Sequence, residues 1–314
     1  QQSNDILPII TLHEAIKISK ENYPSLKQKQ LEIEKQQLLK SAAFDFGTTQ
    51  IFTGGDEVGD DKGVYTTLGI GQSNIDLFGI SPKRKLQEQR ILLAQKTFQL
   101  SELALELEVK KAWSNALQSK RNYNLYKELD TIYANFEKSV ALNYEVEAIS
   151  KLEYSAAKNQ ALQIHNKTRQ AYSEYVIALQ QLNLWLVSDE LSTVPDEFDV
   201  VNEIDMNTFS WEAHPLYNIS QLQVAEAAAN FKVAKAENLP KFNFQGGLQK
   251  INGNSRFYTY RAGISIPLLS GTTKAQIRTG QIDKQIAEVT IKFKKMEVQS
   301  KFVQAKENYQ KQKN

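Results

Sequence analysis

The chain has 314 residues, enough for one large or two ordinary domains. Its net charge is +2, and Lys and Arg are scattered along helical segments rather than clustered, so the composition gives no support for a nucleic-acid partner. The sequence contains no cysteine, which excludes disulfides, thiolate metal sites and a cysteine nucleophile, and it has no run of ~18 apolar residues that would predict a transmembrane helix.

The first segment, residues 10–46, has the apolar spacing of a helix. Thr11 followed by Glu14 is the pattern of a capping box at its start, and Pro24 predicts a break or kink. We therefore expect a helix that is interrupted about one third of the way along.

Two extended segments follow at residues 46–54 and 64–75, separated by a polar loop rich in Gly and Asp. In the second segment Leu68 and Ile70 share one face, because side chains alternate along a strand. The faces of the first segment cannot be assigned from its sequence. The pattern predicts a β-hairpin.

A long helix is predicted from Lys83 to about Glu145, with leucines recurring every seven residues at its start. About 60 residues at ~1.5 Å each give ~90 Å, which suits a spacer or a tube better than a compact core. The chain is expected to reverse over residues 146–150 and to return as a second helix over residues 152–187. Residues 188–207 carry seven acidic residues, Pro195 and no Lys or Arg, and are interpreted as a linker or girdle segment.

A second hairpin is predicted from strands at residues 242–249 and 257–266, joined by turn chemistry at residues 251–256. Each strand has one apolar and one polar face. A lone hairpin is marginal in water, so we expect something outside the chain to complete it. The residues assigned to the apolar, lipid-facing sides of the strands are Leu68, Ile70, Phe242, Phe244, Leu248, Tyr258, Tyr260, Ala262, Ile264 and Ile266.

The plan of helix, hairpin and helix occurs twice, which indicates an internal duplication. Gly69 corresponds to Gly263, and the apolar faces of the two copies then agree. The predicted division is residues 1–187 for the first repeat, 188–208 for the acidic linker, and 209–314 for a second repeat that is incomplete at its C-terminal end. We expect a further long helical excursion after Asn314.

Strands of ~9–11 residues with alternating faces have the length needed in a membrane β-barrel. One chain offers only four such strands, whereas bacterial membrane barrels begin at about eight, so several chains would have to build one barrel together. The competing interpretation is that both hairpins pack on a soluble helical core.

Several segments resemble TolC-type outer-membrane efflux proteins. Thr11–Ile16 with Asn22-Tyr23-Pro24 is similar to the opening of that family, and Gly263–Leu268 with Gly271 is similar to its second hairpin exit. Gln72–Gly79 resembles the first exit in the heavy-metal (copper/silver or cobalt/zinc/cadmium) branch. Ala148–Tyr154 resembles the tip of the family's helical hairpin. The resemblance covers essentially the whole chain.

The resemblance implies a mainly α fold with membrane β-hairpins, in which a homotrimer forms one shared β-barrel in the outer membrane and a long α-helical barrel in the periplasm. It also implies contact with a periplasmic adaptor (membrane fusion) protein and, through it, an inner-membrane RND-type pump. The family commonly has Gly where this chain has Glu147, and a large apolar residue where it has Ser155. Carried onto this sequence, the adaptor contact falls on Val146, Glu147, Ala148, Ile149, Ser150 and Leu152.

No catalytic or cofactor site is predicted. His13, His165 and His214 are isolated and lack a second ligand at helical spacing. Two methionines and no cysteine give no soft-metal site for Cu(I). The leading hypothesis is a passive export duct for heavy-metal cations or small toxic compounds. The alternative is a soluble coiled-coil scaffold or stalk protein without transport activity.

Overall fold

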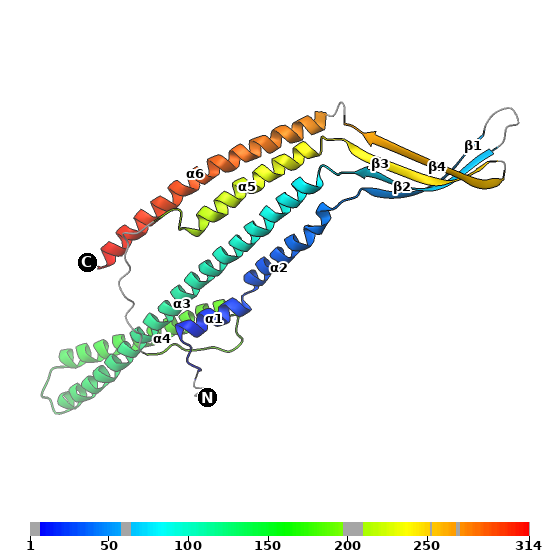
Figure 1. Ribbon diagram of the computed structural model, residues 1–314. Helices are drawn as coiled ribbons and strands as arrows, with labels where there is room; N and C mark the ends of the chain where they lie inside the picture. Colours follow the sequence, from blue (N-terminus) through cyan, green and yellow to red (C-terminus); the bar gives the residue numbers. More distant parts are fainter. Residues whose placement is uncertain (1–6, 58–63, 197–209, 252, 268–270, 314) are drawn as a thin grey trace. The chain divides into compact units, whose positions relative to one another are not determined.

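The computed structural model is built from long helices and one small antiparallel sheet (Figure 1). Its contacts divide the chain into two units. The tip unit comprises residues 1–28 and 99–204, and the sheet unit comprises residues 29–98 and 205–314. The structure describes residues 7–57, 64–196, 210–251, 253–267 and 271–313.

The N-terminal helical segment begins and breaks as predicted. Helix α1 spans Leu12–Asn22, and Thr11 caps it: the Thr11 amide donates to a Glu14 carboxylate oxygen at 2.9 Å, and the Glu14 amide donates to Thr11 Oγ1 at 3.3 Å. Helix α2 begins at the predicted break and spans Pro24–Leu39. The prediction of helix up to residue 46 is wrong. Ser41 Oγ donates to the Leu38 carbonyl at 2.7 Å, and the chain tightens there into a short 3₁₀ turn.

Helix α3 spans Ile80–Glu145 and has 66 residues, so its contour is ~100 Å long. It starts three residues before the predicted position, directly after a turn that Asp76 stabilises. The Gly79 amide donates to Asp76 Oδ1 at 2.8 Å, and Lys83 Nζ lies 2.8 Å from Asp76 Oδ2. Asp76 is buried, so both of its oxygens are satisfied by local partners.

In the tip unit, α3 packs along helix α4, which spans Lys151–Leu186. The core is formed by large side chains that are almost fully buried: Val109, Trp113, Leu179, Leu182, Leu186 and Val194. Residues 188–196 pack onto this core, where Thr193 pairs with Ile9 and Lys120 donates to the Val194 carbonyl. The remainder of the predicted acidic linker, from residue 197, lies outside the described residues.

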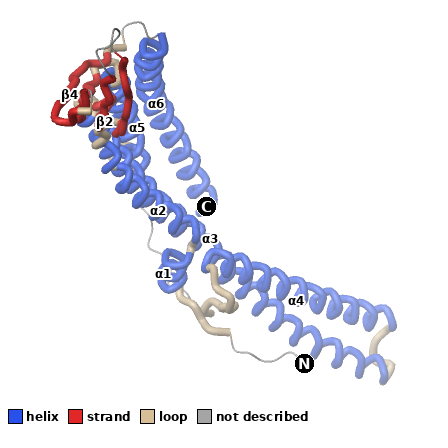
Figure 2. Tube along the Cα trace, turned by 90° about the vertical axis from the view of Figure 1, so that its right-hand side faces the viewer, coloured by secondary structure: helices blue, strands red, loops and turns tan. Residues whose placement is uncertain are grey.

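In the sheet unit, the helices lie side by side, and each adjoins one of the strands along the chain (Figures 1 and 2). Hydrogen bonds join α2 to α3, and an ion pair joins α3 to helix α5, Pro215–Ala236. Helix α5 in turn packs along helix α6, Gly271–Lys313. The helix order therefore matches the strand order.

The four strands form one antiparallel sheet in the order β1-β2-β3-β4. The first hairpin pairs β1, Thr48–Glu57, with β2, Val64–Ile75, and the second pairs β3, Lys241–Ile251, with β4, Asn254–Ser265. Both predicted hairpins are confirmed, and the plan of helix, hairpin and helix occurs twice in the structure.

Candidate membrane sheet and helical tip

One face of the sheet is apolar across all four strands. Its pairing register brings Leu68, Leu248 and Tyr258 into one row, and Ile70 and Tyr260 into the next. Two further rows pair Phe244 with Ala262 and Phe242 with Ile264. The strand residues assigned to the apolar face from sequence thus share a single face of the sheet, except that Ile266 follows the last residue of β4.

This apolar face is exposed. Tyr260 is 91% exposed and Tyr258 84%, while Leu68 and Ile70 are each 59% exposed. Ile51, which sequence alone could not assign, lies opposite Ile70 and is 80% exposed. No helix covers these side chains, so the interpretation that the hairpins pack on a soluble helical core does not hold for the described residues.

The opposite face is polar and rich in glycine. One row across it reads Gln50, Gly71, Gln245 and Arg261. Phe52 lies over Gly69 in the next row: a Cβ built on Gly69 would come within 2.4 Å of the Phe52 ring and 2.6 Å of a backbone oxygen. A side chain at position 69 would therefore displace the aromatic ring.

The sheet unit also has unpaired edges. Among the described strands, β1 and β4 each have a partner on one side only. Helix α6 follows β4 in the sequence and packs with one side against α5, where Gly280 lies close to Phe231. Another side of α6 carries exposed apolar residues at alternating spacings of four and three, which is the pattern of a coiled-coil seam. These residues are Ile282, Ile286, Val289, Phe293 and Met296. The sequence analysis did not single out this seam.

The reversal between α3 and α4 is a compact turn at the predicted place. The Glu147 amide donates to the Tyr144 carbonyl at 3.0 Å, and the Ala148 amide donates to the Asn143 carbonyl at 2.9 Å. This is the Schellman arrangement that usually has glycine at its left-handed position. Here that position is Glu147, with φ of 58°.

Helix α4 then begins with a capping box. The Glu153 amide donates to Ser150 Oγ at 3.3 Å, and the Ser150 amide donates to Glu153 Oε2 at 2.7 Å. The Ser150 amide and hydroxyl both donate to Glu153 Oε2, and these two hydrogen bonds lower the pKa of Glu153. The Ser-x-x-Glu spacing was the available sequence signal for this start. Next to the turn, the ring of Tyr144 on α3 stacks on the ring of Tyr154 on α4 with centroids 5.0 Å apart, so the two helices are in contact there.

The predicted tip residues surround this turn, and two of them present apolar side chains to solvent. Val146 is 73% exposed and Leu152 79% exposed, one on each side of the reversal. Glu147 and Ala148 are also exposed, whereas Ile149 is half-buried and Ser150 is occupied as the helix cap. The structure therefore gathers the six residues at one end of a helical hairpin.

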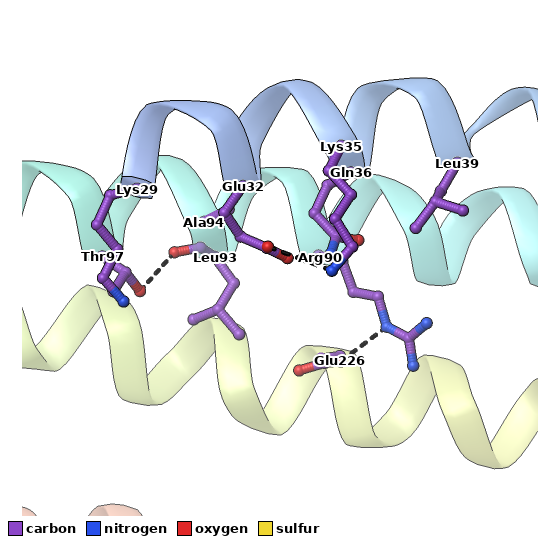
Figure 3. Close-up of a pocket in the computed structure, with 10 residues that line it drawn as sticks. All are labelled: Lys29, Glu32, Lys35, Gln36, Leu39, Arg90, Leu93, Ala94, Thr97 and Glu226. Carbon is purple, nitrogen blue, oxygen red and sulfur yellow. Dashed lines mark hydrogen bonds and ion pairs between the residues drawn. The ribbon is translucent and has the colours of Figure 1, made fainter. Parts of the chain in front are cut away.

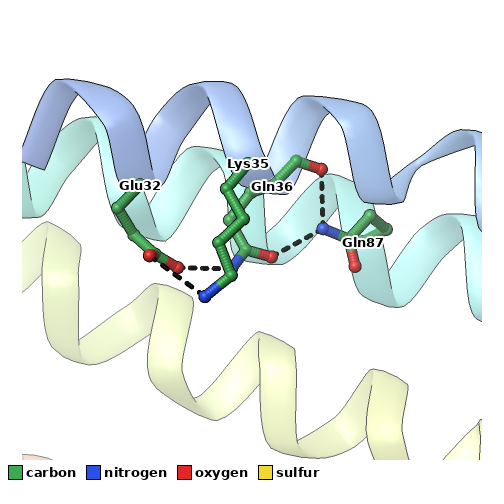
Figure 4. A network of polar contacts seen from close by, with 4 residues as sticks. All are labelled: Glu32, Lys35, Gln36 and Gln87. Atoms are coloured by element: carbon green, nitrogen blue, oxygen red, sulfur yellow. Dashed lines mark hydrogen bonds and ion pairs between the residues drawn. The ribbon is translucent and has the colours of Figure 1, made fainter.

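The helices of the sheet unit are linked by polar contacts in addition to a small buried apolar cluster of Leu86, Ala229 and Val233. Gln87 is buried, and its amide donates to the carbonyl and side-chain oxygens of Gln36 at 2.7 and 2.6 Å (Figure 4). Gln36 in turn donates to Glu32 at 2.6 Å, and this bond lowers the pKa of Glu32. Arg90 pairs with Glu226 at 3.0 Å.

Of these residues, Glu32, Gln36, Arg90 and Glu226 line a cavity of about 360 Å³ between α2, α3 and α5 (Figure 3). Lys29, Lys35 and Leu39 come from α2, and Leu93 and Thr97 from α3. Charged and amide groups thus occupy the surface where the helices meet, as expected for a helical wall in contact with water.

His214 and His165 have structural contacts. His214 Nδ1 accepts from the Leu216 amide at 3.2 Å and caps α5, and burial lowers the pKa of His214. His165 Nδ1 lies 3.2 Å from Asp130 Oδ2. Within the described residues, no group of three His, Asp or Glu side chains is placed to hold a metal ion. No described helix combines the length and apolar content needed to cross a bilayer.

A duplicated helix–hairpin–helix plan, with long helices continuing into a four-stranded sheet, is the fold of TolC-type outer-membrane channels. The chain superposes on the CmeC outer membrane channel of Campylobacter jejuni with a TM-score of 0.72 at 14% identity, covering 90% of this chain and 67% of that one. For CusC, the TM-score is 0.72 at 15% identity, with 94% and 74% covered. For a membrane protein from Pseudomonas aeruginosa, the TM-score is 0.74 at 17% identity, with 92% and 74% covered. No family model and no curated protein sequence matches the chain. The likeness is one of fold.

Proposed function

We propose that this protein is the outer-membrane channel of a tripartite efflux system and acts as a passive export duct. The observation that carries the proposal is the exposed apolar face of the sheet, with Tyr258, Tyr260 and Ile264 each at least 60% exposed. A contiguous apolar surface of this kind costs free energy in water and is favourable against lipid. The polar face then lines the interior.

The unpaired edges support assembly from several copies. An open sheet cannot lie in hydrocarbon, because the unpaired amides of β1 and β4 would have no hydrogen-bond partner there. Pairing β4 of one copy with β1 of the next satisfies both edges and closes a ring. Three copies give the ring of twelve strands that the resemblance implies, and the resulting homotrimer lies in outer-membrane lipid with its helices in the periplasm.

The exposed seam on α6 supports the same assembly. Phe293 and Met296 are 63% and 68% exposed and lie on the helix that follows the edge strand β4. A seam with four–three spacing is stabilised when a second helix packs into it. Helix α2 precedes β1 in the chain. If β4 of one copy pairs with β1 of the next, α2 of that next copy is therefore the helix that packs into the seam.

The helical tip supports an adaptor contact. Val146 and Leu152 are exposed apolar side chains on a turn held by hydrogen bonds at both helix ends. A small rigid apolar surface with a polar surround is typical of a protein-binding site. We assign its partner as a periplasmic adaptor protein, joined to an inner-membrane RND-type pump.

The proposal also covers the cargo. The resemblance of Gln72–Gly79 to the heavy-metal branch supports metal cations as one class, and small toxic compounds are the other. In either case the chain supplies a duct and not a reaction, so selectivity arises from pore width and from the charge of the lining.

Two neighbouring residues on β4 provide the test, because they lie on opposite faces. Tyr260→Asp places a charge on the apolar face, where burial in hydrocarbon would cost on the order of 1–2 kcal/mol per chain, less than the ~2–4 kcal/mol of an Arg or Lys at the bilayer midplane. Thr259→Asp places the same charge on the polar face. We expect Tyr260→Asp to reduce the detergent-extracted oligomer in outer membranes sharply and Thr259→Asp to leave it near the wild-type level.

Equal levels of the two variants would contradict the lipid assignment. Recovery of the wild-type protein as a water-soluble monomer without detergent would instead support the soluble scaffold.

A further inference from the structure

The polar face of the sheet carries positive charge. Arg261 on β4 lies beside Gln245, and Lys241 stands on the same face at the start of β3. Among the polar-face residues of the four strands whose side chains the structure describes, these are the charged ones, and both are cationic. Arg261 is exposed and forms no ion pair with a described carboxylate.

We propose that Arg261 makes the interior of the barrel selective for anions, which narrows the two cargo classes named above to small anionic or neutral compounds and leaves out free metal cations. This inference rests on the proposed channel. In a closed trimer, the row of Gln50, Gly71, Gln245 and Arg261 occurs three times around the interior. Three guanidinium groups then form a ring at one level of the pore, flanked by uncharged amides and glycines.

The size of such a pore lets these charges act on a passing ion. Twelve strands ~4.8 Å apart and tilted by ~40° enclose a backbone cylinder of roughly 24 Å diameter. A fully extended arginine reaches ~7 Å inward and brings its charge to about 5 Å from the axis, inside the Debye length of ~8 Å at physiological salt. With the dielectric constant of water, three such charges enrich a monovalent anion at that level on the order of tenfold.

One acidic residue of the sequence follows the same alternation. Asp56 is six residues from Gln50 along β1, and its side chain lies outside the described residues. Six residues of strand span ~20 Å, which is more than twice the Debye length.

The test is the reversal potential of the full-length protein reconstituted in planar lipid bilayers under a KCl gradient. We expect a chloride preference of several-fold for the wild type, a marked loss of that preference in Arg261→Gln, and its retention in Arg261→Lys. The matched control is Lys250→Gln, which removes a positive charge from the opposite face of the neighbouring strand, beside Thr66. We expect this control to conduct with wild-type selectivity.

The outcomes separate this inference from the proposed function. Conductance with a preference for potassium, or with a chloride preference that Arg261→Gln leaves unchanged, overturns the assignment of Arg261 and leaves the channel intact. A wild-type protein that forms no conducting pore overturns the channel and this inference together. Loss of chloride preference in Lys250→Gln equal to that in Arg261→Gln shows a diffuse charge effect and also overturns the assignment.

Discussion

Glu147 at the helical tip has a backbone conformation that suits glycine better than glutamate. Its φ of 58° lies in the left-handed region, where a Cβ costs about 1–2 kcal/mol. Glu147→Gly removes that strain, but it also adds ~0.5–1 kcal/mol of backbone entropy to the opened chain. The net expectation is that the turn becomes more stable by about 0.5–1 kcal/mol.

Hydrogen exchange at the turn measures this directly. The amides of Glu147 and Ala148 donate to the Tyr144 and Asn143 carbonyls, so they exchange only when the turn opens. A gain of 0.5–1 kcal/mol corresponds to exchange that is roughly two- to fivefold slower in Glu147→Gly than in the wild type. The measurement is made on the intact protein in detergent, because it reports local opening and needs no global unfolding.

Glu147→Ala is the matched control. It removes the same carboxylate from the C-terminal end of α3 but keeps a Cβ at the left-handed position. We expect its exchange to change little, since only a small unfavourable interaction with the helix dipole is lost. If Glu147→Gly and Glu147→Ala slow exchange equally, the backbone-strain argument is wrong and the charge explains the effect.

Two further predictions concern helix contacts. Hydrogen bonds and ion pairs from Lys110 and Lys20, each 2.8 Å away, hold the pKa of Glu106 at about 2, below its usual 4.5. The stabilisation from these contacts is therefore present above pH 4.5 and is lost as the pH falls toward 2. After allowance for solvent exposure, Glu106→Gln should lower the free energy of unfolding by about 1 kcal/mol at pH 7 and leave it unchanged below pH 2. Thermal unfolding at both pH values measures this difference. At the tip, Leu152→Asp should abolish cross-linking to the adaptor while the oligomer persists, and Leu162→Asp, at a 56% exposed position farther along α4, should leave cross-linking unchanged. If the effect of Glu106→Gln did not depend on pH, the Glu106 assignment would be wrong. If Leu152→Asp and Leu162→Asp lost cross-linking equally, the tip assignment would be wrong.

Much of the sheet could be predicted because strand alternation is a local property. Tyr258, Tyr260 and Ile264 repeat every second residue, and the structure places them on one exposed face. The first strand was different: Ile51 and Phe52 are neighbours of similar hydrophobicity, so alternation alone cannot choose between them. Only the pairing of Ile51 with Ile70 and of Phe52 with Gly69 decides which side each occupies.

Contacts between distant segments could not be predicted from one sequence. Arg90 and Glu226 are 136 residues apart, and nothing local to either indicates their ion pair. The end of α2 at Leu39 was also missed, because Ser41 competes for a backbone carbonyl within a segment that otherwise keeps helical spacing. At the tip, the reversal was predictable, whereas the left-handed geometry of Glu147 required the backbone.

The central claim is that β4 of one copy pairs with β1 of the next, and the absence of native cysteine allows a direct test. Thr53→Cys on β1 is combined in turn with Tyr258→Cys, Tyr260→Cys or Ala262→Cys on β4, all on the apolar face. Within one chain these strands are ~14 Å apart, too far for a disulfide, so any bond must join two copies. Oxidation of intact outer membranes should link dimers and trimers for at least one pair and nothing larger. Chains that remain unlinked in all three pairs, or ladders extending beyond three chains, would contradict the closed trimer.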